Sequence, residues 1–107
     1  MNELRSFKEF HIDELKDPEK AKSYIDVALE DYQDDSDTEA LLLALRDVVE
    51  AQGGVGELAK KTGLNRPNIY KALSQKGNPR INTLGTILHT MGLRLSVDRI
   101  APEIKHQ

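Results

Sequence analysis

A run of hydrogen-bonding side chains at positions 65–71 has the residue types best suited to binding chemistry. Arginine can make two-pronged hydrogen bonds to guanine edges, and asparagine can make them to adenine edges. Four residues of the run are therefore predicted to contact DNA bases: Arg66, Asn68, Tyr70 and Lys71. A second, basic or amide-bearing set is predicted to contact the phosphate backbone, which gives affinity without sequence information: Lys60, Lys61, Asn65, Lys76 and Arg80.

The apolar residues around this run have the spacing of a helix-turn-helix. In this motif two short helices, expected at about 55–62 and 66–75, cross steeply over a turn of three or four residues. Ala59 is small enough for the crossing, and Gly63 permits the positive φ of the turn. The residues expected to pack the motif together are Leu58, Ala59, Gly63, Leu64, Ile69 and Leu73. The alternative is a plain helical hairpin whose basic face is merely solvated.

The charges of the chain are segregated along its length. Residues 1–51 carry six Lys or Arg and fifteen Asp or Glu, a net charge of −9, whereas residues 52–107 carry nine and three, a net charge of +6. No acid occurs between Glu57 and Asp98, so this stretch would not repel phosphates. Segregation of this kind predicts two partners of opposite charge.

Helix signals precede the motif. Residues 1–15 lack a clean period and predict an extended arm, with a short strand near 10–12. Asp17 followed by Pro18 predicts a helix start. A run of turn-forming residues at 34–37 then ends that helix, and Ser36 or Asp37 can cap a second one that Gly53-Gly54 terminates.

A third set of signals follows the motif. A helix is expected at about 83–91, with Asn82 as its cap and Gly92 at its end, and Asn65 is expected to cap the helix before it. Residues 93–97 alternate apolar and polar side chains, which predicts a short strand. One strand is unstable alone, so it should pair with the N-terminal arm or with a second subunit. The two-fold logic of operators also favours a homodimer.

Several function classes are disfavoured. The chain has no cysteine, and His11, His89 and His106 lie far apart in sequence without metal spacing, so we expect no metal or cofactor. No residue has an evident nucleophile–base partner, so we expect no enzyme. Because no long apolar run or secretory signal occurs, we expect a cytoplasmic protein without a membrane partner.

Residues 65–74, together with Gly77-Asn78-Pro79-Arg80 and Thr83-Leu84, resemble the addiction-module antidote proteins, which are HigA-type antitoxins with a Xre/lambda-repressor-like domain. Residues 15–19, Tyr24, residues 28–30 and residues 92–97 resemble the same family, so the similarity runs from about Phe10 to Val97. The sequence departs from the family at Gly56, where many relatives carry a capping Ser or Thr, and at Pro67 in the first turn of the second motif helix.

The resemblance implies a mainly α-helical, five-helix lambda-repressor-like domain with a short C-terminal strand. We expect one domain over residues 1–107, with the following parts: an acidic arm and helix at 1–35, a helix-turn-helix core at 36–92, a strand at 93–97 and a flexible tail at 98–107.

The resemblance further implies an antitoxin that represses its own operon and neutralises a small, basic RelE/HigB-like toxin. A basic ribonuclease surface would attract acidic side chains, and the candidates for this contact are Asp26, Glu30 and Asp31. The alternatives are a stand-alone phage-type repressor without a toxin, and a protein-interaction module with no role at DNA.

Overall fold

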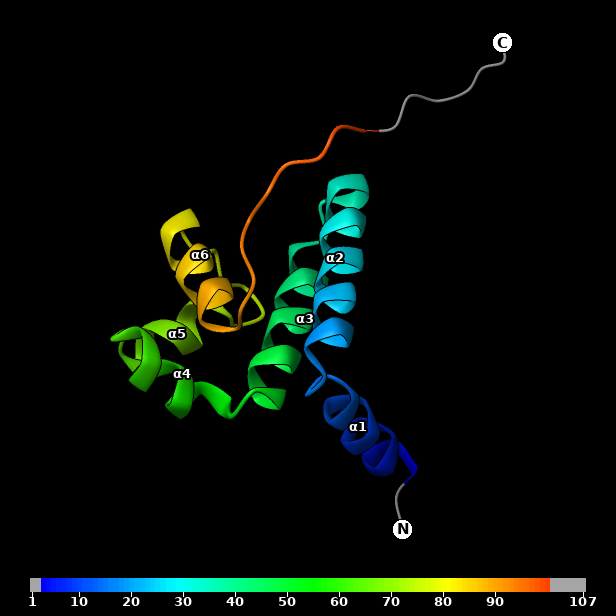
Figure 1. The fold of residues 1–107 in the computed structure, drawn as a ribbon, viewed down its shortest axis with the longest axis vertical. Helices are drawn as coiled ribbons and strands as arrows, with labels where there is room; N and C mark the ends of the chain where they lie inside the picture. The colour runs from blue at the N-terminus through cyan, green and yellow to red at the C-terminus, as the bar shows by residue number, and fades with distance from the viewer. Residues whose placement is uncertain (1–2, 101–107) are drawn as a thin grey trace.

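The computed structural model describes residues 3–100, with side chains from residue 7 onward, and this part of the chain is all-α (Figure 1). Its six helices are α1 Glu3–Glu14, α2 Pro18–Asp35, α3 Thr38–Ala51, α4 Gly54–Thr62, α5 Arg66–Ala72 and α6 Ile81–Thr90. No helix within residues 3–100 is long and apolar enough to cross a membrane. Residues 101–107 of the predicted tail lie outside the described residues.

The predicted N-terminal arm is wrong, because residues 3–14 form α1 and bring the helix count to six instead of five. Leu15, just after the helix, is buried, and Ile12 packs against the same core. Phe7 and Phe10 on α1 remain 70% and 62% exposed. These two outward aromatic residues disguised the amphipathic period of the helix.

The predicted strand at 93–97 is also wrong, because no strand occurs among residues 3–100. Residues 93–100 instead leave α6 as an outstretched segment (Figure 1). A strand needs a neighbour to share its hydrogen bonds, and the arm that could have provided one is helical.

Local signals at the helix ends mostly agree with the predictions. The Asp17 side chain accepts from the Glu19 N–H at 2.9 Å, and Asp37 accepts from the Ala40 N–H at 3.1 Å. The predicted cap Asn82 is wrong, because α6 begins earlier and Arg80 precedes it, with no side-chain cap. Asn82 lies within the first turn, where its carbonyl accepts from the Thr86 hydroxyl.

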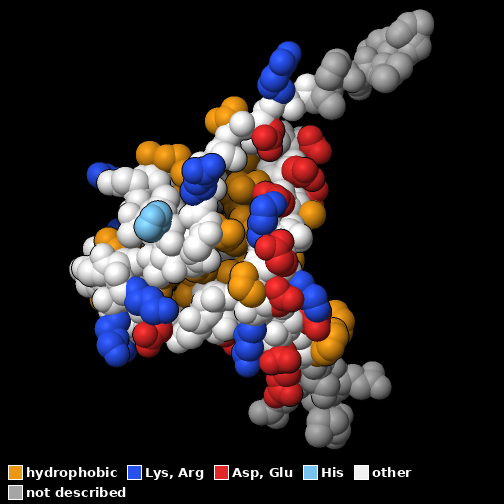
Figure 2. Space-filling view, viewed as in Figure 1, with side chains coloured by type: hydrophobic (Ala, Val, Ile, Leu, Met, Phe, Trp, Pro, Cys, Tyr) orange, Lys and Arg blue, Asp and Glu red, His pale blue; other side chains and the backbone are white. Residues whose placement is uncertain are grey.

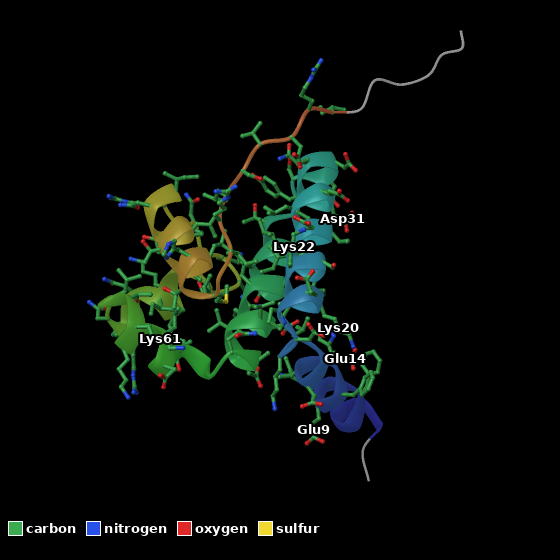
Figure 3. All side chains as sticks on the ribbon, in the orientation of Figure 1. Glu9, Glu14, Lys20, Lys22, Asp31 and Lys61 are labelled. Carbon is green, nitrogen blue, oxygen red and sulfur yellow. The ribbon has the colours of Figure 1, made fainter. Side chains whose placement is uncertain are left out.

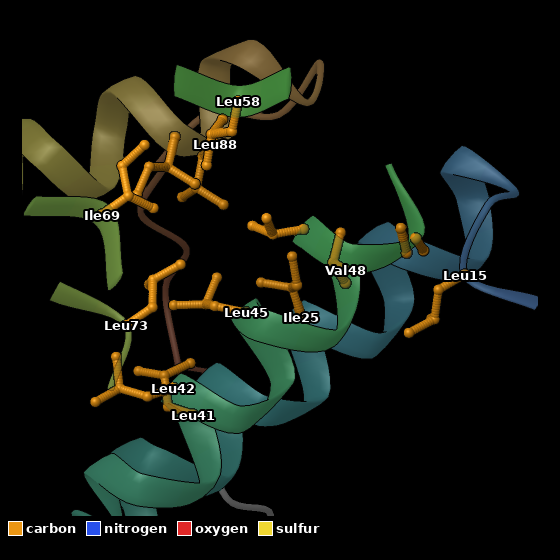
Figure 4. Packing of buried hydrophobic residues seen from close by; sticks show 14 residues of the cluster. Leu15, Ile25, Leu41, Leu42, Leu45, Val48, Leu58, Ile69, Leu73 and Leu88 are labelled. Atoms are coloured by element: carbon orange, nitrogen blue, oxygen red, sulfur yellow. The ribbon is translucent and has the colours of Figure 1, made fainter. Parts of the chain in front are cut away.

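Helix α3 lies at the centre of the core (Figures 1 and 4). Half of its fourteen residues are buried: Leu41, Leu42, Ala44, Leu45, Val48, Val49 and Ala51. One side of α3 packs against α2, which contributes Ala21 and Ile25. The other side is covered by the buried residues of α4 to α6 and the turn after α5: Leu58, Ile69, Leu73, Ile87 and Leu88. Replacing a central leucine of α3 by alanine should lower the free energy of unfolding by about 2–5 kcal/mol.

A polar cluster joins α1, α2 and α3. The Tyr24 hydroxyl donates to the Asp47 carboxylate at 2.9 Å, and His11 Nε2 lies 3.5 Å from the same carboxylate. The His11 and Tyr24 rings meet edge to face, with centroids 4.9 Å apart. Burial, followed by the hydrogen bond to Asp47, raises the pKa of Tyr24 to about 12.

A side-chain hydrogen bond and a close approach of the chain occur at the end of α5. The Arg46 guanidinium on α3 donates to the carbonyl of Leu73, which follows the last residue of α5. The chain then turns back so closely that a Cβ at Gly77 would lie 2.7 Å from the Lys71 carbonyl oxygen, and closer still to that of Ala72. Only glycine fits here without a shift of the backbone.

Tyr24→Phe should lower the free energy of unfolding by about 0.5–1.5 kcal/mol at neutral pH, because Asp47 loses its donor. The pKa of Tyr24 is raised in the folded state, so the neutral hydroxyl stabilises the fold below pH 10, and this contribution is lost as the pH rises through about 12. The difference in the free energy of unfolding between wild type and variant, measured by chemical denaturation, should therefore shrink above pH 10. Tyr32→Phe, at an exposed position, is the control; an equal effect there would contradict the assignment.

Gly77→Ala should destabilise the protein by about 1–3 kcal/mol, because the added methyl overlaps the carbonyls at the end of α5. Gly85→Ala in α6 is the matched control. Its Cβ would meet only Leu95 Cδ1, at 3.9 Å, so it should be neutral or slightly stabilising. Thermal unfolding of both variants measures the difference, and equal melting temperatures would refute the close-approach argument.

Candidate nucleic-acid interface

Helices α4 and α5 meet over a three-residue turn, 63–65. Gly63 has φ +79°, and its N–H donates to the Ala59 carbonyl at 2.9 Å. The Thr62 hydroxyl donates to the Leu58 carbonyl at 2.8 Å and accepts from the Leu64 N–H at 3.1 Å. The turn is therefore closed by its own hydrogen bonds.

The residues expected to pack the motif lie on its inner side. Leu58, Ile69 and Leu73 are buried, with Ile69 fully inaccessible, and Ala59 and Leu64 pack against the same core. The first turn of α5 is capped by Asn65, whose side chain accepts from the Asn68 N–H at 2.9 Å. Burial of Ile69 fixes which side of this short helix faces outward.

The four residues predicted to contact bases are all exposed on α5. Asn68, Tyr70 and Lys71 are free to meet a ligand, and Tyr70 is 62% exposed. Arg66 differs, because its guanidinium folds back over α4: a Cβ at Gly56 would lie 2.9 Å from Arg66 Nη2. Gly56 thus makes room for the Arg66 side chain, which must swing away from α4 to reach a base.

The residues predicted to contact phosphates surround α5. Asn65 is the cap described above, Lys60 and Lys61 occupy the last turn of α4, and Lys76 and Arg80 lie in the loop before α6; all are exposed. Within residues 3–100, none of the four cations among them forms an ion pair. Between α4 and α6 is a shallow hollow without acidic residues, lined by Lys61, Thr62, Asn82, Gly85, Thr86, His89 and Thr90.

Acidic side chains gather on the opposite side of the molecule. Figure 2 shows them along the edge formed by α2, and Figure 3 places Asp31 and Lys61 on opposite sides of α3. Asp26 accepts from Lys22 at 2.8 Å, whereas Glu30 and Asp31 are exposed. Asp37 caps α3 and Asp35 accepts from the Asp37 N–H, so these two carboxylates have structural roles.

Two residues that shape the basic surface around α5, Arg46 and Gly56, were not predicted from the sequence. Arg46 contributes to the charge count of the acidic half, and its guanidinium also donates to the Leu73 carbonyl at the end of α5. Its place between the apolar positions Leu45 and Val48 was a usable signal, because a cation there must find a partner. The family resemblance marks Gly56 only as a departure from a capping Ser or Thr, whereas its missing side chain accommodates Arg66.

No three His, Asp or Glu side chains within the described range gather closely enough to hold a metal ion. The described part of the chain presents two exposed surfaces of opposite charge. Both surfaces are suited to binding.

Comparison with known proteins connects these surfaces to a family. Residues 6–99 match the family model described as probable addiction module antidote protein. A protein of Haemophilus influenzae described as uncharacterized is 29% identical over 93 residues, which cover 86% of this chain and 91% of that protein. No solved structure matches the chain. An antidote implies a cognate toxin as its partner. Because the family model spans nearly the whole chain, the protein belongs to the family of probable addiction module antidote proteins.

Proposed function

We propose that this antidote represses its own operon by docking α5 of a lambda-repressor-like domain in the major groove of operator DNA, and that it neutralises a small basic toxin of the RelE/HigB type. The DNA-binding part of this proposal rests on the exposed outer side of α5, which carries no acid. The fully buried Ile69 determines which side of α5 faces outward. In this proposal the chain acts by binding and not as an enzyme.

Base contact is assigned to the outward side chains of α5. Asn68 lies near the N-terminal end of the helix, which usually faces the base edges in such motifs. Tyr70 and Lys71 follow it on the exposed side. Arg66 reaches a guanine only after leaving Gly56, so its contribution includes the cost of that movement.

The net charge of −3 does not oppose DNA binding, because α5 itself carries no acid and most acids lie on α1 to α3; the exceptions are Glu57 on α4 and Glu39, which accepts from Gln75 at 3.4 Å. Helix α3 lies between α2 and the α4–α6 group, and packed helix axes are about 8–10 Å apart. Exposed charges two helix layers apart are separated by more than the Debye length of about 8 Å at physiological salt. Phosphates near α5 therefore meet mainly the local cations.

The toxin contact is assigned to the outer side of α2. Glu30 and Asp31 are exposed there, and Val27, one turn from Asp31, is 54% exposed. Apolar side chains on α1 are exposed beside this acidic edge (Figure 2). Acidic groups steer a basic partner into place, and exposed aromatic residues supply the apolar centre of an interface. Family membership implies a toxin, which disfavours a stand-alone repressor.

Lys60→Ala/Lys61→Ala and Asn68→Ala should weaken DNA binding in different ways. The double lysine variant should bind all sequences more weakly and reduce the salt slope by about 2. Asn68→Ala should weaken the free energy of binding to the preferred DNA sequence by about 1–3 kcal/mol, and it should relax the sequence preference at one base pair of the site. Fluorescence anisotropy with DNA from upstream of the chain's own gene, at several salt concentrations, measures both effects.

Lys16→Ala, an exposed lysine outside the motif, is the control and should bind like wild type. Unchanged affinity in both motif variants would refute the assignment to α4 and α5. It would favour the reading in which this surface meets a protein and has no role at DNA.

Glu30→Arg/Asp31→Arg should slow association with the toxin by about tenfold or more, because reversed charges repel a basic surface. Charge reversal is preferred to deletion because Ala21 and Ile25 of the same helix belong to the core. Stopped-flow binding to the product of the neighbouring gene, together with growth rescue, measures the effect. The Lys60→Ala/Lys61→Ala variant should neutralise normally; if the reversed variant does too, the contact lies elsewhere.

A further inference from the structure

Gly56 is a glycine that its own backbone does not require. Positive φ angles, which favour glycine, occur instead at Gly53, Gly54, Gly63 and Gly92. Gly56 lies inside the short helix α4, where alanine would be the more stabilising residue. The space that a side chain at position 56 would need is occupied by the Arg66 guanidinium. The glycine therefore serves the placement of Arg66 and not the course of the backbone.

The Arg66 guanidinium lies across Gly56 with more than one of its atoms. A Cβ at position 56 would lie 2.9 Å from Nη2, 3.3 Å from Cζ and 3.6 Å from Nε. Among the side chains from residue 7 to residue 100, Arg66 has no partner in an ion pair or a hydrogen bond. Packing alone holds the guanidinium in this folded-back position, so the side chain can leave it without breaking a polar contact.

We propose that Gly56 is a specificity-determining residue, because it sets how much of the protein presents Arg66 to a guanine. This inference rests on the proposed operator contact of α5. In the free protein Arg66 is divided between the folded-back position and an extended position, and only the extended one can donate two hydrogen bonds to a guanine edge. The affinity for a site with that guanine is reduced by the fraction of the protein in the extended position.

An added methyl at position 56 should shift this balance without disturbing the fold. At Gly77 a Cβ would overlap backbone carbonyls, which cannot move away easily. At Gly56 it would overlap only the end of a flexible side chain, so Arg66 can swing outward and α4 can keep its course. Gly56→Ala should therefore unfold at the wild-type temperature or above it, and it should favour the extended position of Arg66.

Binding to DNA with single base-pair replacements tests the proposal. The probe is the DNA upstream of the chain's own gene, and Arg66→Ala first identifies the base pair whose guanine preference depends on Arg66. Gly56→Ala should increase the preference for guanine at that base pair by about three- to tenfold in fluorescence anisotropy, because the folded-back position is lost. Gly56→Ala/Arg66→Ala should show no such gain. Gly85→Ala, a glycine replacement in α6 away from Arg66, is the matched control and should bind like wild type.

Three results of this experiment would overturn the inference: no base pair that depends on Arg66, a gain by Gly56→Ala that persists without Arg66, or an unchanged guanine preference in Gly56→Ala. If the last result accompanies a sequence preference that Asn68→Ala relaxes, the operator proposal stands and only the role of Gly56 is wrong. If the wild type prefers no DNA sequence, the operator proposal fails, and this inference fails with it.

Nuclear magnetic resonance of the full chain tests the folded-back position directly. Nuclear Overhauser contacts between the Arg66 side chain and the Gly56 Hα atoms should appear in the free protein, because the guanidinium lies across that residue. They should weaken or vanish when the upstream DNA is added. Their absence from the free protein, or their persistence unchanged in the complex, would overturn the proposal.

Discussion

Burial of α3 on two sides is the constraint on which the rest of the structure depends. Leu42, Leu45 and Val48 are almost fully inaccessible, and they contact elements from both ends of the chain. A helix apolar on so much of its circumference cannot be covered by one neighbour. Helix α2 packs on one side and α4 on the other, while α5 and α6 pack on α4 and add buried side chains to the same core. Those short helices are below the length at which isolated helices persist, so their orientation comes from this packing.

The same arrangement separates two surfaces that would otherwise interfere. Acids on α2 and cations around α5 lie on opposite sides of α3 (Figure 3). A single surface of mixed charge would partly repel a charged partner of either sign. Arg46 crosses this division: it belongs to the acidic half in sequence but donates to the Leu73 carbonyl beside the basic surface. The separation is therefore one of position in space and not simply of position in sequence.

The predictable parts of the fold were those set by neighbouring residues. The caps Asp17, Asp37 and Asn65 and the turn at Gly63 depend on contacts within a few positions, so residue type was enough to find them. Helix α1 was missed because its outward phenylalanines hide the face that packs against α3. The Arg46–Leu73 and Arg66–Gly56 contacts join positions 27 and ten residues apart, so the local pattern can indicate that Arg46 needs a partner but cannot identify that partner.

A shared core also has a consequence for turnover in the cell. Ala21 and Ile25 of α2 cover the side of α3 that faces away from α5. The leucines of α3, such as Leu42 and Leu45, belong to one core that contains both α2 and the helices α4 to α6. A protease that trimmed α2 would expose those leucines, and the remaining short helices would lose the platform that orients them. The chain would then not decay into a lasting fragment that still occupies one partner. Cleavage at one end removes both surfaces together, so the lifetime of the whole molecule sets how long either surface acts.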